Sequence, residues 1–184
     1  MSVNIHRCIW SFWSKPFQMH CHKTWASEKH HLLAWILSVE TARRHYPETV
    51  LYTDDEGARM LVDGLGLSFS EVSTALNDLH DADPEWWVLG KLHAYRAQKK
   101  PFIHIDNDAF LWQPLAPDIA AASVFTQSPE WFPFDGESWY RPRFYDQCLR
   151  EQGGWMPDEW CWYIERGMGE AVACGVLGGS VRTS

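Results

Sequence analysis

The chain has no long apolar run and no paired-cysteine motif. No stretch of about 18 apolar residues occurs in its 184 residues, so we expect no membrane-spanning helix. The N-terminus lacks the long apolar core and small-residue cleavage site of a secretory signal. The cysteines are odd in number and contain no Cys-x-x-Cys pair, which predicts reduced thiols in a cytoplasmic protein. They are Cys8, Cys21, Cys148, Cys161 and Cys174.

A basic excess is also missing. The formal net charge is −8, which disfavours nucleic acid as a partner because a phosphate backbone requires a basic surface. A small anionic ligand remains compatible with this charge if a cation bridges it to the protein. His20, Cys21 and His22 suggest zinc, but alternate positions on a short loop rarely complete a tetrahedral site.

Apolar residues make up 46% of the chain, and 12 residues are tryptophan. A chain of this length fits one domain with a sizeable core. Strand-like and helix-like segments alternate along it, which predicts an α/β fold with a mostly parallel central sheet and helices on both faces. The expected strands are 5–13, 49–53, 68–73, 102–105, 123–127 and 171–179. The expected helices are 27–46, 57–65, 86–100, 142–153 and 158–166, and residues 14–16 are expected to turn the chain.

Two carboxylates directly follow an apolar strand, in residues 101–114, PFIHIDNDAFLWQP. If this segment is extended, Asp106 and Asp108 share a face while Asn107 faces away. Two close carboxylates repel each other unless a cation lies between them, and carboxylate oxygens suit Mg²⁺ or Mn²⁺. The alternative is a satisfied surface feature, and a second Asp-x-Asp, Asp81-Ala82-Asp83, lies in a polar stretch that we interpret as a solvated loop.

Other candidate ligand-binding residues lie next to the predicted strands. Ser11 and Trp13 end the first strand, at the edge of the sheet where α/β proteins collect ligands, although Trp13 also fits a core position. Asp54 follows the second strand and is suited either to a ribose contact or to capping the next helix. Lys91 is suited to phosphates or to a solvated helix face, and the glycine pair at 178–179 permits close backbone approach to a ligand.

Four segments resemble nucleotide-sugar-dependent glycosyltransferases of the GT-A fold, in order and in spacing. They are WSFWSKP, LYTDDEG, GKLHAYRAQKKPFIHIDNDAFLW and ACGVLGGS. The resemblance implies one GT-A-like domain over 1–184, with a Rossmann-like nucleotide- and metal-binding part in 1–114 and the start of an acceptor part in 115–184. Such enzymes usually continue past the glycine-rich strand, so the acceptor part is expected to be incomplete, and an exposed edge after Leu177 favours self-association into a homo-oligomer.

The resemblance also implies a reaction and a set of residues. A Mn²⁺ or Mg²⁺ ion held by Asp108, with Asp106 on the metal or the donor ribose, would bind the diphosphate of a nucleoside-diphosphate sugar, a UDP-sugar being favoured, for transfer to an acceptor. An inverting enzyme also needs a carboxylate base, for which Asp158 and Glu159 are the candidates, although they also suit the start of a helix. The remaining implied donor contacts are Ser11, Trp13, Thr53, Asp54, Lys91, Gly178 and Gly179.

Two other functions remain open. One is a non-catalytic domain that binds a nucleotide or a glycan without transferring a sugar. The other is a nucleotidyltransferase, which is expected to have a Gly-rich basic loop after the first strand, whereas SFWSKPFQ contains no glycine.

Overall fold

A computed structural model describes residues 5–136 and 139–180. The side chains of residues 20–24, and with them the zinc candidates His20, Cys21 and His22, lie outside the described part. The chain divides into two compact units, residues 1–126 with 174–184 and residues 127–173. The expected division at residue 114 separates a nucleotide-binding part from an acceptor part and stays a prediction.

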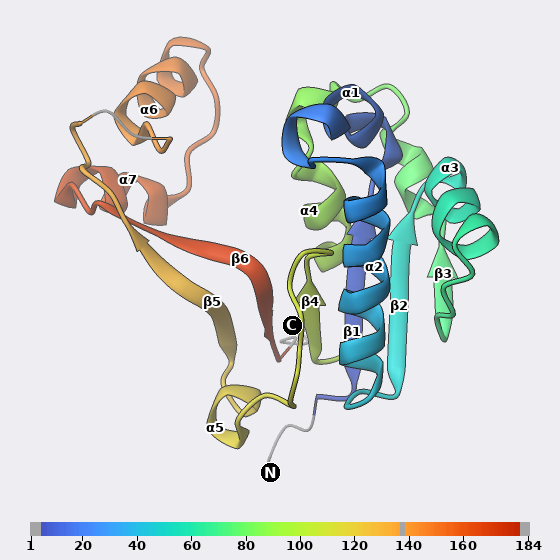
Figure 1. Cartoon of the computed structure of the whole chain (residues 1–184). Coiled ribbons are helices and arrows are strands. Elements are labelled where there is room, and N and C mark those ends of the chain that lie inside the picture. Colours follow the sequence, from blue (N-terminus) through green and yellow to red (C-terminus); the bar gives the residue numbers. More distant parts are fainter. Residues whose placement is uncertain (1–4, 137–138, 181–184) are drawn as a thin grey trace. The chain divides into compact units, whose positions relative to one another are not determined.

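The fold is α/β, with a mixed sheet in the order β3-β2-β1-β4-β6-β5 (Figure 1). The strands are β1 Arg7–Phe12, β2 Glu48–Thr53, β3 Glu71–Ser73, β4 Phe102–Ile105, β5 Val124–Trp131 and β6 Glu170–Gly179. β1 pairs in parallel with β2 and β4, and β2 pairs in parallel with β3, as the alternation of strands and helices predicts. β6 instead pairs antiparallel with β4, so the sheet is only partly parallel. Because β6 lies between β4 and β5, Leu177 does not leave an exposed edge, contrary to the sequence prediction.

The α-helices are α1 Ser14–Thr24, α2 Glu28–Arg43, α3 Asp55–Ala58, α4 Leu89–Arg96, α5 Pro117–Ala120, α6 Pro142–Glu151 and α7 Asp158–Arg166. Three other helical segments are the π-helix η1 Arg59–Gly64 and the 3₁₀ helices η2 Ala75–Leu79 and η3 Pro84–Trp86. The turn expected at residues 14–16 is wrong, because Ser14 begins α1 and Pro16 lies in its first turn, where proline's missing N–H costs no hydrogen bond. None of the helices within 5–136 and 139–180 is both long and apolar enough to cross a membrane.

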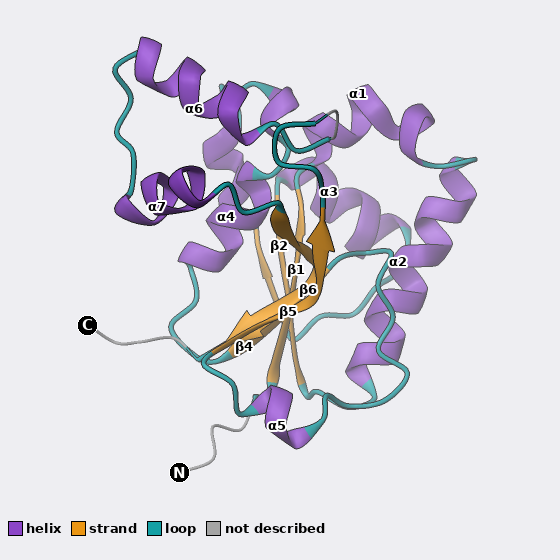
Figure 2. Cartoon of the chain, turned by 90° about the vertical axis from the view of Figure 1, so that its left-hand side faces the viewer, coloured by secondary structure: helices purple, strands orange, loops and turns teal. Residues whose placement is uncertain are grey.

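Apolar side chains on both faces of the sheet build the core of the first unit. Trp10 and Phe12 of β1 pack in one cluster with Trp35 and Val39 of α2. The alternate residue Ile9 packs in a second cluster with Ala94 of α4, as expected for a strand buried on both sides. Figure 2 shows α2 and α4 on opposite sides of the strands.

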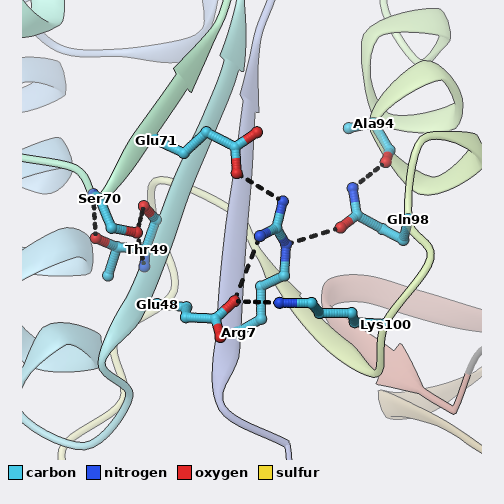
Figure 3. A network of polar contacts seen from close by, with 8 residues as sticks. All are labelled: Arg7, Glu48, Thr49, Ser70, Glu71, Ala94, Gln98 and Lys100. Carbon is cyan, nitrogen blue, oxygen red and sulfur yellow. Dashed lines mark hydrogen bonds and ion pairs between the residues drawn. The ribbon is translucent and has the colours of Figure 1, made fainter.

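A polar network fixes the amino ends of the parallel strands (Figure 3). The Arg7 guanidinium donates to Glu48 at 3.4 Å, to Glu71 at 3.1 Å and to the Gln98 side-chain oxygen at 3.2 Å. The Lys100 ammonium lies 3.6 Å from the same Glu48 carboxylate. These charged side chains lie at the starts of β1, β2 and β3, whereas the candidate site lies at the opposite, carboxyl ends of β1 and β4.

Candidate functional site

One cavity of about 680 Å³ lies at the carboxyl ends of β1 and β4, beside α1 and the start of α4. Of the residues selected from the sequence, Ser11, Trp13, Lys91, Asp106 and Asp108 all line it. These residues come from three separate segments of the chain. Parallel pairing brings the carboxyl ends of β1 and β4 to one edge of the sheet, and the start of α4 carries Lys91 to the same cavity.

The acidic pair lies in a turn that follows β4 and not in an extended segment. The Ala109 amide donates to the Asp106 carbonyl at 3.0 Å, which closes the turn directly after Ile105. The prediction that Asn107 faces away is therefore wrong: Asn107 lines the cavity together with Asp106 and Asp108. Its side-chain nitrogen is buried and has no hydrogen-bond partner among the described residues.

The backbone of Asp106 is held from two elements, β6 and α2. Its amide donates to the Gly175 carbonyl of β6 at 2.8 Å. Its carbonyl accepts from the Ser38 hydroxyl of α2 at 3.0 Å, and that hydroxyl accepts from the Trp10 indole N–H at 2.9 Å. A fixed backbone limits the positions that the Asp106 carboxylate can reach, as a preorganised site requires.

A short ion pair joins Lys91 to Asp106. The Lys91 ammonium lies 2.6 Å from one Asp106 carboxylate oxygen, and the exposed fractions of the two side chains are 15% and 23%. The same ammonium lies 5.3 Å from the centre of the Trp87 ring, a cation–π contact. Burial raises the pKa of Asp106, the nearby Lys91 ammonium opposes that rise, and Asp108 adds to it. The carboxylate is thus partly desolvated and already paired with a cation of the chain.

A buried histidine orients Ser11 at the wall of the cavity. The His104 ring lies 3.0 Å from the Ser11 hydroxyl through Nε2 and 3.3 Å from the Tyr95 hydroxyl through Nδ1. Burial, and to a smaller extent Lys91, lowers the pKa of His104 to about 3, so the ring is neutral at pH 7. A neutral imidazole donates through one nitrogen and accepts through the other, so both hydroxyls are held in defined orientations.

Aromatic residues that the sequence analysis did not select line another part of the cavity. Phe17 of α1 stacks on the His31 ring with 4.1 Å between the ring centres, and Trp25 meets the same ring edge-on. His31 accepts from the Trp35 indole through Nε2 at 3.0 Å, which places its proton on Nδ1. That nitrogen is buried without a hydrogen-bond partner in the described part of the chain. The sequence prediction placed a turn at residues 14–16, so the helix over 14–24 that carries Phe17 was not recognised.

Thr53 and Asp54 do not line the cavity, because their polar atoms bond within the fold. The Thr53 hydroxyl donates to the Phe12 carbonyl at 2.7 Å. One Asp54 oxygen accepts from the Gly57 amide at 2.8 Å and caps α3. The other accepts from the amide and hydroxyl of Ser14 at 2.9 and 2.8 Å. Of the two roles weighed for Asp54, the geometry favours the helix cap.

The remaining candidates lie elsewhere. Gly178 and Gly179 pair with Ile103 and Phe102 near the start of β4, whereas the cavity follows its end. A Cβ at Gly178 would lie 2.3 Å from the Phe102 carbonyl oxygen, so close strand packing explains this glycine. Asp158 and Glu159 are exposed in the first turn of α7, in the second unit, where negative charge suits a helix N-terminus.

The donor set at the cavity fits a hard divalent cation in part. Asp106 and Asp108 provide carboxylate oxygens, the ligands that Mg²⁺ and Mn²⁺ favour. Among the described residues, no group of three or more histidine, cysteine or acidic side chains is placed to hold a metal. Two carboxylates leave coordination positions for water and for phosphate oxygens. A metal here would therefore depend on a phosphate-containing molecule bound in the same cavity.

Comparison of the chain with curated proteins and with solved structures gives no match. A family model does match, and it covers residues 6–183, nearly the whole chain and both compact units. The family is described as one of unknown function, DUF6734, and the chain belongs to it.

Proposed function

We propose that the cavity binds a nucleoside-diphosphate sugar together with Mn²⁺ or Mg²⁺, and that the protein is a glycosyltransferase of the hexosyltransferase type with a GT-A-like, Rossmann-like nucleotide-binding half. The observation that carries the proposal is the convergence of Ser11, Trp13, Lys91, Asp106 and Asp108 on one cavity. The volume of about 680 Å³ lies in the range of small-molecule sites.

Each part of the cavity has a chemistry that suits one part of such a donor. Trp13 and the aromatic residues around His31 offer ring faces to a base or a sugar. Lys91 offers positive charge to phosphates, and the two carboxylates offer oxygen ligands to a cation. When bound, the metal would stabilise negative charge on the departing nucleoside diphosphate.

A thermal-shift titration with UDP and GDP, with and without Mn²⁺, tests the proposal. We expect UDP with Mn²⁺ to stabilise the chain by about 2.7 kcal/mol at 100 times its dissociation constant. Asp108→Asn should abolish the metal-dependent part of this shift. The matched control is Asp81→Asn in the second Asp-x-Asp, an exposed position outside the cavity, and it should leave the shift unchanged.

Failure of every nucleotide to shift the unfolding temperature would overturn the proposal. A metal-dependent shift without release of UDP from UDP-sugars, tested with a panel of sugar acceptors, would leave a nucleotide-binding domain and refute the transferase.

A further inference from the structure

Asp106 and Asp108, two of the acidic residues that line the cavity, differ in how their charge is balanced. One oxygen of Asp106 lies 2.6 Å from the Lys91 ammonium, and both side chains are mostly buried. Asp108 is exposed and makes no ion pair or hydrogen bond with a described side chain. The described side chains therefore supply a cation to Asp106 and none to Asp108.

This difference opposes the binding of a free divalent cation. A cation that coordinates both carboxylates must compete with the Lys91 ammonium for Asp106. It must also approach that ammonium in a partly desolvated site, where two positive charges repel more strongly than in water. The Trp87 ring, 5.3 Å from the ammonium, further stabilises Lys91 in its present position.

A phosphate changes this balance. Lys91 lines the same cavity as both carboxylates, so an anionic ligand there can accept the ammonium that Asp106 releases. The ammonium then stays paired, its repulsion of the divalent cation is offset by the negative charge of the ligand, and Asp106 becomes available as a metal ligand.

We propose that Lys91 makes the site select a complex of a divalent cation with a diphosphate over the free cation. Lys91 pairs with Asp106 until a phosphate replaces Asp106 as the partner of the ammonium. The inference rests on the proposed function and adds to it a specificity-determining residue. Coupling of this kind is reciprocal: the diphosphate raises the affinity for the cation by the same factor as the cation raises the affinity for the diphosphate.

The test is a direct measurement of Mn²⁺ binding by electron paramagnetic resonance, with the metal alone and with inorganic pyrophosphate. Pyrophosphate should tighten Mn²⁺ binding by about 5- to 150-fold in the native chain, after correction for the complex formed in solution. Lys91→Met should bind Mn²⁺ alone about 10-fold more tightly, because Asp106 loses its competing cation. In the same variant the effect of pyrophosphate should be smaller than in the native chain, because only its direct coordination of the metal remains.

Two further variants guard against a purely structural effect. Lys91→Gln removes the charge but keeps a hydrogen-bond donor for Asp106, so it covers the case in which Lys91→Met does not fold. Lys100→Met removes a lysine that pairs with Glu48 at the opposite end of the sheet, and should leave both affinities unchanged. A merely structural Lys91 would lower stability in Lys91→Met and Lys91→Gln without tightening Mn²⁺ binding.

The outcomes separate this inference from the proposed function. If UDP with Mn²⁺ binds the native chain but neither Lys91 variant binds Mn²⁺ alone more tightly, the selection mechanism is wrong and the donor site stands. If the native chain binds Mn²⁺ alone as tightly as with pyrophosphate, the mechanism is likewise wrong. If no form binds Mn²⁺, pyrophosphate or UDP, both are wrong.

Discussion

Two histidines next to the cavity are buried in their neutral form. Burial lowers the pKa of His31 to about 4, and that of His104 to about 3. In the unfolded chain both rings take up a proton near pH 6.5. The unfolded state therefore binds more protons than the folded state between about pH 6.5 and pH 4, so stability falls as the pH falls through this window.

We expect each of these histidines to remove about 1.4 kcal/mol of stability per pH unit below pH 6. His31→Gln should reduce the difference in the free energy of unfolding between pH 6 and pH 5 by about that amount, as measured by urea denaturation. Leu33→Gln, an exposed change on the same helix, is the control and should keep the native slope. A slope that His31→Gln leaves unaltered would show that His31 is already protonated in the folded state.

At the scale of elements, the Asp54 side chain joins the starts of two helices, α1 and α3. Asp54 accepts hydrogen bonds at the first turns of both α1 and α3, through Ser14 and Gly57. α1 carries Phe17 to the cavity wall, so this carboxylate shapes the cavity without lining it.

Asp54→Ala should destabilise the chain by about 2 kcal/mol or more, because it removes a helix cap and leaves partly buried N–H groups unpaired. Urea denaturation without any ligand measures this loss. Asp63→Ala, an exposed acidic position on η1, should change the free energy of unfolding by less than about 0.5 kcal/mol. Equal stability of the Asp54→Ala and native chains would contradict the capping role and favour a ligand contact for Asp54.

At the scale of the whole molecule, residues 127–173 form the second unit. In the sequence they lie between the part of β5 and the part of β6 that belong to the first unit. The cavity, both core clusters and the Arg7 network are all built from residues of the first unit. The family model nevertheless spans both units, so the inserted segment is part of what defines the family.

Replacing residues 127–173 by a short glycine–serine linker should leave a chain that still unfolds cooperatively, because its core contacts lie within the first unit. Circular dichroism during thermal unfolding measures this. A control that replaces residues 54–79, which include α3, η1 and β3, should abolish the cooperative transition because it removes the core residue Leu61. Loss of cooperativity in the first variant would show that the two units fold only together.

The sequence alone determined the order of most strands and helices. Periods of two and of about 3.6 are local properties, so β1, α2, β2, α7 and β6 could be located from them. The sequence also predicted that Asp106 and Asp108 follow a buried strand at the same edge of the sheet as Ser11 and Trp13, which end another strand. That prediction needed only the parallel pairing of β1 with β4, which the connecting helices favour.

Tertiary structure alone decided which of these residues meet. β6 runs antiparallel to β4, so Gly178 and Gly179 pair near the start of β4, away from the cavity, and no local pattern specifies the direction of a strand. The Asp54 carboxylate bonds within the fold because Ser14, 40 positions earlier in the chain, donates to it from both its amide and its hydroxyl. Lys91 reached Asp106 because Gly90, whose Cβ would lie 3.3 Å from that of Trp13, lets α4 pack closely against the end of β1. Contacts between distant segments depend on the packing of the whole unit, and that is why periodicity predicted the elements and not the ion pair at the site.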